Sequence, residues 1–421
     1  MSNPDNGVDH LFADEERTAA GEAKYRAGAL RRRDANPDGS PSQDSQQIRF
    51  WSPPPANERR PAELPGMSAK PSVVSRRPEA RSADRERLLT LCALRHGELG
   101  RIDGSLLART AQTPEALDRW FAGQVIERSP KADKARNILE WALRDGAAIE
   151  EAEDFVGRQL AAAYAAGADV TTVLDPDYPA NLRLVPDAPA FLFYRGQLDP
   201  ADARSIAVVG TRQATPDGRA RAARMARGLS DAGIVVVSGL ARGIDTVAHT
   251  TALDGGRRTV AVIGNGIAGN TYPPENAFLA DRIVDGGGAV ISQFWPTDPT
   301  DQWRFPARNI TMSGYTQGTL VVEAASTSGA KLQAQSARRH SRTVFLLRSL
   351  AATQAWARKM LTEARAEFSQ PRQLDLTAPA DQDLPLAVVE VGDVGDVIAR
   401  VADAAAVQAA ADMRLELAGA W

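Results

Sequence analysis

The chain has 421 residues, 50 Lys and Arg against 53 Asp and Glu, a formal net charge of −3 and one cysteine, Cys92. This length has room for about two or three domains, and a single cysteine excludes both a disulfide framework and a multi-cysteine zinc site. The chain contains no run of about 18 apolar residues, which is the length needed to span a bilayer. Its N-terminus has no apolar signal core. We therefore expect a cytoplasmic protein.

Charge is distributed unevenly along the chain. Residues 201–350 contain 17 Lys and Arg against 11 Asp and Glu, so this part is basic although the whole chain is acidic. A basic module within an acidic protein indicates an anionic partner. Ordinary solvated surface charge is the alternative explanation.

The N-terminal part divides into a polar tail and a helical region. Residues 1–83 are rich in Pro, Ser, Arg, Asp and Gln and contain few periodic apolar positions, which predicts a disordered tail. Apolar residues then recur at helical spacing over 84–150, with stops expected at Gly97, Gly100 and Gly146. Thr113-Pro114-Glu115 has the form of a capped helix start. We predict a small helical domain here.

A different pattern fills residues 151–350. A helix over 150–166 leads to a short strand, a Pro-rich turn and a second extended stretch. Short β-branched runs then alternate with helical patterns, which predicts a doubly wound, mainly parallel α/β sheet. The runs are 205–209, 234–237, 259–263, 289–292, 319–322 and 343–347, and the helical patterns are 217–232, 244–254, 274–285 and 329–340.

The last part, 351–421, is predicted less fully. We expect a helix over 353–366, a linker over 369–384, and a strand followed by a helix over 386–421, with the fold of this small C-terminal segment left open.

The predicted ligand site follows from the loops after the strands. In an open α/β sheet, ligands bind at the carboxyl ends of the strands. The loops there are 210–218, 238–245, 264–276, 292–296 and the FPARN stretch 305–309, and they are rich in glycine, hydroxyl groups and arginine. Arg212 and Arg242 can each hold a phosphate with two hydrogen bonds, and Ser238, Gly239 and Gly243 precede a helix start. We predict a phosphate cradle, with plain turn chemistry as the alternative.

Other candidate motifs are weaker. Gly264 to Gly269 spells G-x-G-x-x-G, but Asn270–Pro274 intervenes before any helix, so we expect neither NAD nor another cofactor. His249 and Cys92 are expected to be packed side chains. Asp245, Glu275 and Glu323 are not spaced like metal ligands, so we expect no metal site and no catalytic residues.

Five segments in fixed order resemble the DprA/Smf family: IAVVGTRQATPDG, GIVVVSGLARGIDTVAH, TVAVIGNGIAGNTYPPEN, FPARN and TLVVEAASTSGAKLQAQSA. Members of that family bind single-stranded DNA and, in transformable bacteria, help to load the RecA recombinase onto it. The resemblance implies an extended Rossmann-like sheet over 151–350 and a small helical (SAM-like) domain over 84–150. It covers roughly residues 85–347.

The resemblance also implies a set of DNA- or phosphate-binding residues, and Phe305 in that set is either a base-stacking surface or a packed core aromatic. The resemblance implicates Gly210, Thr211, Arg212, Ser238, Gly239, Arg242, Gly243, Phe305, Pro306, Arg308 and Asn309, and the predicted DNA- or phosphate-binding set also includes Gly264 and Gly266.

Some positions depart from the family pattern. The family's RNR run reads Arg308-Asn309-Ile310 here, its acidic residue after the fourth strand is Gln293, and its Pro-Gly turn is replaced by FLLRSL. These differences predict a divergent member.

We expect a homodimer that binds single-stranded DNA with little sequence choice and presents it to a RecA-like recombinase, in DNA uptake, recombination or phage defense. A nucleotide hydrolase of the LOG group is one alternative, with Gly314–Thr319 and Glu323 in place of that group's P-G-G-x-G-T-x-x-E motif, and a sensor of a nucleotide signal is another.

Overall fold

The computed structural model describes residues 83–369 and 388–419. Residues 1–82, 370–387 and 420–421 lie outside the described part of the chain. Nearly all of the predicted tail, 1–83, and of the predicted linker, 369–384, therefore falls outside it.

The region before the sheet is helical, as its apolar spacing predicts. Thr113 caps a helix there by accepting a hydrogen bond from Ala116 N at 3.2 Å, which confirms the predicted helix start. The helix Pro130–Arg144 ends with Asp145 as its C-cap, directly before Gly146, so the predicted stop is confirmed, and a separate 20-residue helix begins at Gly146. A short hairpin between the first two helices was not predicted, since strands of two residues leave no pattern. The elements are α2 (Ala83–Ala93), β1 (Arg95–His96), β2 (Gly100–Arg101), α3 (Gly104–Thr110), α4 (Pro114–Phe121), α5 (Pro130–Arg144) and α6 (Gly146–Ala165).

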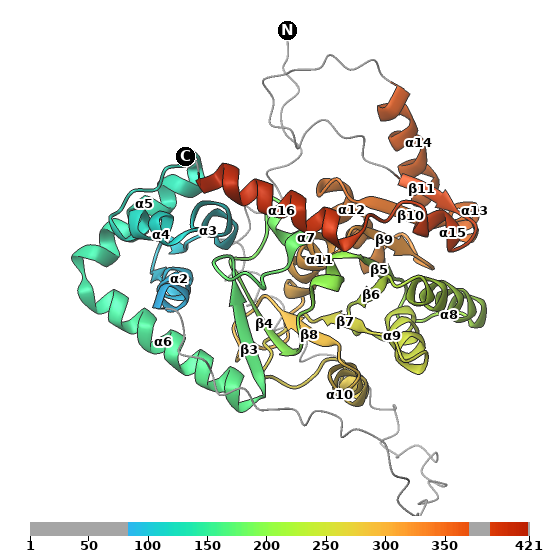
Figure 1. The fold of residues 1–421 in the computed structure, drawn as a ribbon, viewed down its shortest axis with the longest axis horizontal. Helices are drawn as coiled ribbons and strands as arrows, with labels where there is room; N and C mark the ends of the chain where they lie inside the picture. The colour runs from blue at the N-terminus through green and yellow to red at the C-terminus, as the bar shows by residue number, and fades with distance from the viewer. Residues whose placement is uncertain (1–82, 370–387, 420–421) are drawn as a thin grey trace, which may run out of the picture. The chain divides into compact units, whose positions relative to one another are not determined.

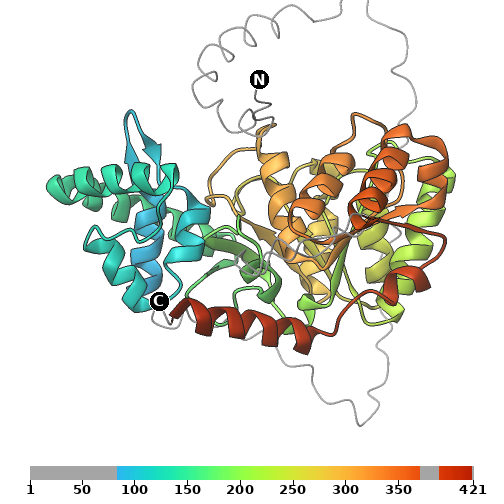
Figure 2. The ribbon, with the colours of Figure 1, turned by 90° about the horizontal axis from the view of Figure 1, so that it is seen from above.

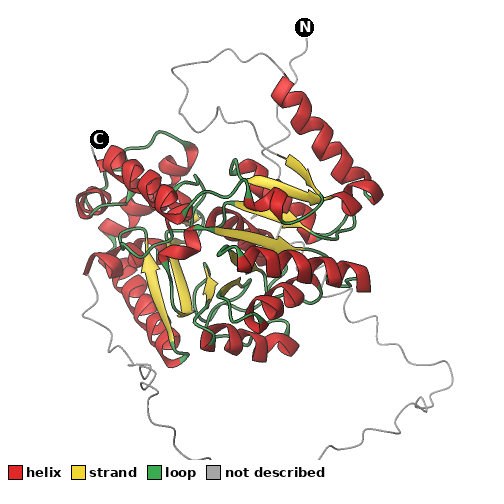
Figure 3. Cartoon of the chain, turned by 45° about the vertical axis from the view of Figure 1, so that its right-hand side comes forward, coloured by secondary structure: helices red, strands yellow, loops and turns green. Residues whose placement is uncertain are grey.

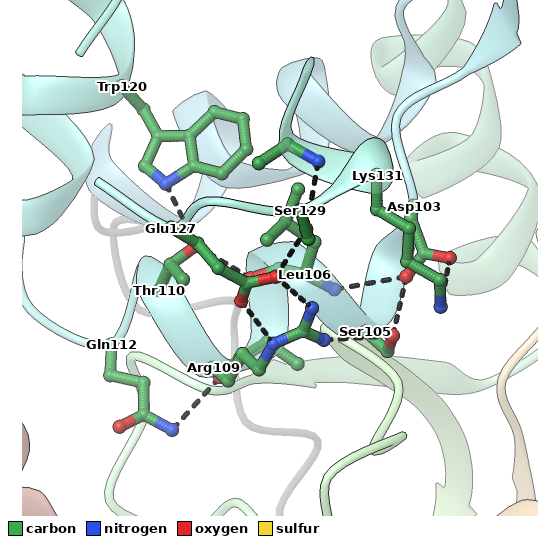
Figure 4. Close-up of polar contacts among 12 residues, drawn as sticks. Asp103, Ser105, Leu106, Arg109, Thr110, Gln112, Trp120, Glu127, Ser129 and Lys131 are labelled. Carbon is green, nitrogen blue, oxygen red and sulfur yellow. Dashed lines mark hydrogen bonds and ion pairs between the residues drawn. The ribbon is translucent and has the colours of Figure 1, made fainter. Parts of the chain in front are cut away.

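Polar contacts fasten the loop between α4 and α5 to α3 (Figure 4). Arg109 forms two hydrogen bonds to Glu127, at 2.6 and 2.8 Å, and this contact lowers the pKa of Glu127. Lys131 Nζ lies 2.8 Å from Asp103. Because every one of these groups has a partner within the region, the network stabilises the helical region itself.

A nine-stranded sheet forms the centre of the rest of the described chain, in the order β11-β10-β9-β5-β6-β7-β8-β4-β3 (Figure 1). The strands from β5 to β11 pair in parallel, whereas β3 and β4 pair antiparallel at one edge. This confirms the predicted α/β class with a mainly parallel sheet. The strands are β3 (Ala168–Thr172), β4 (Phe191–Gly196), β5 (Ser205–Val209), β6 (Val235–Ser238), β7 (Thr259–Val262), β8 (Ala289–Ser292), β9 (Gly318–Val321), β10 (Thr343–Leu347) and β11 (Val388–Val391).

Helices cover both faces of this sheet (Figures 2 and 3). One group, packed side by side, is α8 (Pro216–Asp231), α9 (Ile244–Asp254) and α10 (Ala277–Asp285), and the other is α11 (Arg304–Tyr315) and α12 (Gly329–Arg339). The FPARN stretch was predicted as a loop, but it forms the first turns of α11. Pro306 misled that prediction, because proline is well tolerated in the first turn of a helix.

The C-terminal segment joins the sheet. Its strand β11 pairs with β10 in parallel, with Val388 opposite Val344. Helix α16 (Ala404–Gly419) packs on the short helices α7 (Ala180–Arg183) and η2 (Pro200–Ala203) through the buried Ala411. The elements are α13 (Arg348–Thr353), α14 (Ala355–Ser369), α15 (Gly395–Ile398) and α16 (Ala404–Gly419), together with the short helices α7 (Ala180–Arg183), η2 (Pro200–Ala203) and η3 (Pro274–Asn276). Within the described residues, no helix has both the length and the apolar character needed to cross a membrane.

Candidate functional site

A cleft of about 590 Å³ opens where the order of the strands reverses. The chain passes from β5 to β6 on one side and later returns to β9 on the other, so the loops after β5 and β9 diverge and leave a crevice at the carboxyl ends of the strands. The lining residues come from four segments: Val209–Gln213, then Ala241, Arg242 and Asp245, then Phe305, Arg308, Asn309 and Met312, and finally Ala325, Thr327–Ala330 and Gln333.

The loop after β5 supplies the first wall of the cleft. A Cβ on Gly210 would lie 2.4 Å from the side chain of Ile244, so only glycine allows α9 to approach this closely. Thr211 N donates to the backbone oxygen of Glu323 at 2.6 Å, which ties the loop to the end of β9. Arg212 is exposed at the rim, and its guanidinium carbon lies 5.4 Å from the centre of the Phe305 ring.

The loop after β6 is held by buried hydrogen bonds. The Asp245 carboxylate accepts from Gly239 N at 3.1 Å and Ala241 N at 3.3 Å, and burial raises the pKa of Asp245. Gly243 has a φ of +77°, and a Cβ there would lie 2.3 Å from Thr211 O. Ser238 was predicted to contact phosphate, but its hydroxyl is fully buried and donates to Val208 O at 2.6 Å. Ser238 therefore holds two strands together and does not face the cleft.

Arg308 has two roles in the geometry of the site. Its buried guanidinium donates to Gly239 O at 2.8 Å and to Val262 O at 2.5 Å, and so it braces the ends of β6 and β7. A Cβ on Gly239 would lie 2.0 Å from Arg308 Nη1, so the glycine makes room for the guanidinium. Burial lowers the pKa of Arg308. The Arg308 side chain also lines the cleft and contributes a positive charge to it.

Phe305 lies at the edge of the cleft, not in the core. The ring is half-buried, and its centre lies 5.6 Å from that of Tyr272, which is 40% exposed. A Cβ on Gly264 would approach the Phe305 ring to 2.8 Å, so Gly264 supports the position of the ring from behind. This geometry is compatible with base stacking, which remains a prediction.

Arg242 is placed differently from what the sequence suggested. Its side chain lines the cleft but forms an exposed ion pair with Glu275, which raises the pKa of Arg242 and lowers that of Glu275. The two residues are 33 positions apart, so no local pattern reveals this pair. A phosphate bound at Arg242 must compete with the Glu275 carboxylate.

Seven of the predicted residues line the cleft: Gly210, Thr211, Arg212, Arg242, Phe305, Arg308 and Asn309. Gly239 lines a small adjoining pocket with Tyr272 and Pro273. Ser238, Gly243, Gly264, Gly266 and Pro306 line neither one. Gly266 instead packs against the backbone at Pro296, where a Cβ would lie 2.3 Å from the carbonyl oxygen.

His249 and Cys92 are buried, which matches the expectation that both are packed side chains. The loop after Gly269 continues into η3, and α10 begins only at Ala277, so the G-x-G-x-x-G run opens no helix. His249 is buried beside Thr259 Oγ1 at 2.8 Å, and burial lowers its pKa to about 3. Burial raises the pKa of Cys92 to about 12. Across the described part of the chain, no group of three or more His, Cys, Asp or Glu is placed to hold a metal ion.

The loop after β9 and the start of α12 form the fourth wall of the cleft, which was not predicted from the sequence. Ser328 caps α12 by accepting from Ala330 N at 3.2 Å. The run Ser326-Thr327-Ser328-Gly329 carries the signal of a helix start after a strand, and right-handed crossovers place this loop beside the one after β5.

The region compared with the LOG motif lies elsewhere. Gly314–Thr319 joins the end of α11 to the start of β9, which is the opposite end of the sheet from the cleft. The carboxylate of Glu323 does not line the cleft, because it accepts hydrogen bonds from Thr215 at the start of α8, at 3.1 and 3.2 Å.

The fold and the site together define a Rossmann-like α/β protein whose cleft is lined by arginines at the carboxyl edge of its sheet. Residues 169–374 match a family model described as DNA recombination-mediator protein A. The chain is 32% identical over 241 residues to DNA processing protein DprA of Bacillus subtilis, which covers 55% of this chain and 79% of that protein. The chain belongs to the DprA/Smf family.

Two further comparisons involve Streptococcus pneumoniae. Its DNA processing protein DprA is 39% identical over 176 residues, covering 42% of this chain and 61% of that protein. The matched part therefore spans less than two thirds of this curated relative. The X-ray structure of DprA from the same organism aligns with a TM-score of 0.53 at 25% identity, covering 76% of this chain and 96% of that one.

Proposed function

We propose that this chain is a cytoplasmic single-stranded-DNA-binding protein that holds a DNA strand in the cleft without turning it over. The carrying observation is that Arg212, Arg242 and Arg308 line the same cleft as the half-buried ring of Phe305, with the Arg212 guanidinium carbon 5.4 Å from the centre of that ring. Guanidinium groups bind backbone phosphates, and an aromatic face stacks on any base. Family membership supports the same class of ligand.

The shape of the site favours a single strand over a duplex. The binding groups line a concave cleft at the edge of a sheet, and they do not form a projecting helix of the kind that enters a major groove. A single strand is flexible enough to bend its backbone into a cleft and to turn a base toward Phe305. A duplex keeps its bases stacked inside and its phosphates on a stiff cylinder.

A binding protein without turnover acts by presenting its ligand to a partner. The matched family model is described as a recombination mediator, which supports a RecA-like recombinase as that partner. We propose that a homodimer presents the strand, in DNA uptake, recombination or phage defense. Light scattering of the full chain with and without oligo-dT tests the assembly, and a strictly monomeric complex would contradict this part of the proposal.

The binding proposal is tested by equilibrium titration of labelled oligo-dT, the matching duplex and a panel of mononucleotides. We expect the single strand to bind most tightly, with log affinity falling against log salt by about 0.7 per neutralised phosphate. A salt-independent affinity, or tighter binding of the duplex, would contradict it. Hydrolysis of ATP, of nucleoside monophosphates or of the DNA would show an enzyme instead.

A further inference from the structure

A separate cavity of about 140 Å³ lies where three parts of the fold meet. The end of α3 forms one wall, the segment that runs from β3 through α7 to β4 forms the second, and α16 forms the third (Figure 1). None of its lining residues also lines the cleft. Its polar lining consists of Arg109, Gln112, Tyr178, Arg183 and Arg414, and its other lining residues are apolar.

Each wall of this cavity contributes one arginine, and none of the described residues that line it is acidic. On α3, the charge of Arg109 is offset by Glu127, to which it forms two hydrogen bonds (Figure 4). Arg183 of α7 is held differently. Its guanidinium donates to Val173 O at 2.7 Å and to Asp175 O, which are neutral backbone groups.

Arg183 is a buried cation without an ion pair. The residue is 7% exposed, and burial lowers the pKa of its guanidinium. Three carboxylates favour its charged form from a distance without forming an ion pair with it, and they belong to Asp175, Asp177 and Asp412. The nearest in sequence of these, Asp175, binds Arg85 at 2.6 Å. A buried charge is costly unless it is paired, so Arg183 favours an anionic ligand in the cavity that it lines.

Arg414 brings a further positive charge to this cavity from α16, where it also donates to Leu184 O at 3.0 Å. The helix is held by little apolar surface, because Val407 and Ala411 are its buried residues among those whose side chains are described. Like charges that face one small cavity repel each other, so Arg183 and Arg414 oppose the docking of α16. An anion between them attracts both and favours docking.

A phosphate group fits this cavity in size and in charge. A cavity of about 150 Å³ can hold a benzene molecule, and a phosphate group is smaller than benzene. Guanidinium groups that approach from three elements suit the tetrahedral oxygens of phosphate, and each can donate two hydrogen bonds to it. A carboxylate offers only two oxygens in one plane and carries less charge.

We propose that this cavity binds a phosphate group, and that the bound phosphate fastens α16 to α7 and to the end of α3. The ligand is inorganic phosphate or a small phosphate monoester, since both present the same group to the arginines. The site is separate from the cleft, and the inference does not depend on the proposed DNA binding.

Hydrogen exchange of the α16 amides in the full chain measures this docking. Phosphate is compared with chloride at equal ionic strength, in the Arg212→Ala background so that phosphate binding in the cleft contributes less. Because the ligand binds only when α16 is docked, exchange should slow about tenfold at a phosphate concentration about ten times the dissociation constant. No slowing at about 50 mM phosphate, far above a millimolar dissociation constant, overturns the proposal.

Gln112→Glu places a carboxylate in the cavity in place of the ligand. The new carboxylate attracts Arg183 and Arg414 itself, so the α16 amides should be protected without phosphate, and added phosphate should slow exchange by less than about twofold. The hydrogen bond that is lost, from Gln112 Nε2 to Ala108 O at 2.9 Å, is local to α3. If the arginines only brace the backbone, this variant leaves the exchange of α16 and its response to phosphate unchanged, which overturns the site.

A matched pair of substitutions separates the cavity from general salt effects. Arg414→Gln removes the charge on α16 but keeps an amide N–H for Leu184 O, and it should abolish the slowing by phosphate. Arg400→Gln makes the same substitution outside the cavity, where Arg400 donates to Asp396 O at 2.8 Å, and it should respond as the wild type does. An equal response to phosphate in both variants overturns the proposal.

Two further ligands identify the source of the phosphate group, again in the Arg212→Ala background. Slowing by dAMP at lower concentration than by inorganic phosphate supports the site with a phosphate monoester as its ligand, and the reverse order supports it with inorganic phosphate. Acetate that slows exchange as strongly as phosphate overturns the assignment of a phosphate group.

Discussion

Gly264 offers a way to move the Phe305 ring without touching the ring itself. The Cβ of alanine at position 264 would lie 2.8 Å from Phe305 Cδ1 and 3.0 Å from Cε1. Carbon atoms in contact normally stay about 3.5–4.0 Å apart, so the ring must withdraw by about 1 Å. Gly264 does not have a positive φ, so alanine is not strained by the backbone. The substitution therefore acts on the side chain of Phe305.

The expected effect follows from what the ring does. Stacking of a base on an aromatic side chain is worth about 1–3 kcal/mol, which Phe305→Ala should remove in full. Gly264→Ala should remove about 1 kcal/mol or more of this, a loss of at least about fivefold in oligo-dT affinity. The overpacking should cost about 1 kcal/mol in the free energy of unfolding. Fluorescence anisotropy measures the affinity, and urea denaturation measures the stability.

A double-mutant cycle tests whether Gly264→Ala weakens binding through the Phe305 ring. If Gly264 acts through the ring, Gly264→Ala adds no further loss once Phe305 is alanine. Gly157→Ala is the matched control, because a Cβ there meets nothing within 4 Å on the surface of α6. Wild-type affinity in Gly264→Ala together with a loss in Phe305→Ala would refute the coupling. Fully additive losses would show that Gly264 acts by another route.

Three further predictions concern charged groups. Arg212→Ala should weaken oligo-dT binding by about 1.5–3 kcal/mol and reduce the salt slope by about 0.7, with the circular dichroism spectrum unchanged. Glu275→Gln releases Arg242 from its ion pair and should tighten binding, and the gain should vanish in combination with Arg242→Ala. Burial holds the pKa of His249 at about 3, whereas an unfolded histidine titrates near about 6.5, so only the unfolded state gains this proton as the pH falls between these values. The free energy of unfolding therefore decreases as the pH falls through that window. Urea denaturation at a series of pH values measures this decrease, and the urea midpoint of His249→Asn should fall less than that of the wild type between pH 6.5 and pH 4.

The sequence predicted the sheet well because its strands are buried on both faces. Runs such as 205–209 and 343–347 are continuously apolar, and the sheet has them where the pattern indicated. Strands β1 and β2 were missed because two residues carry no periodicity. The FPARN stretch was misassigned because its proline and arginine resemble loop residues.

The site was predicted only where a residue's role follows from its own loop. Arg212 sits at the rim as its place after β5 implies. The carbonyl groups that accept hydrogen bonds from Arg308 lie at the ends of β6 and β7. The carboxylate that forms an ion pair with Arg242 belongs to Glu275 in η3. These contacts depend on how distant segments meet in space. The wall formed by the loop after β9 and the start of α12 was missed for a similar reason, because Gln333 looks like an ordinary polar residue of a helix.

Strand β11 shields the apolar strand β10, which would otherwise form the rim of the sheet. Val344, Phe345 and Leu346 are almost completely buried, and an unshielded strand of this kind recruits strands from other molecules. A chain shortened after α14 would keep the whole cleft and yet expose this strand. We therefore expect a chain shortened in this way to self-associate through β10, although β11 contributes no residue to the cleft.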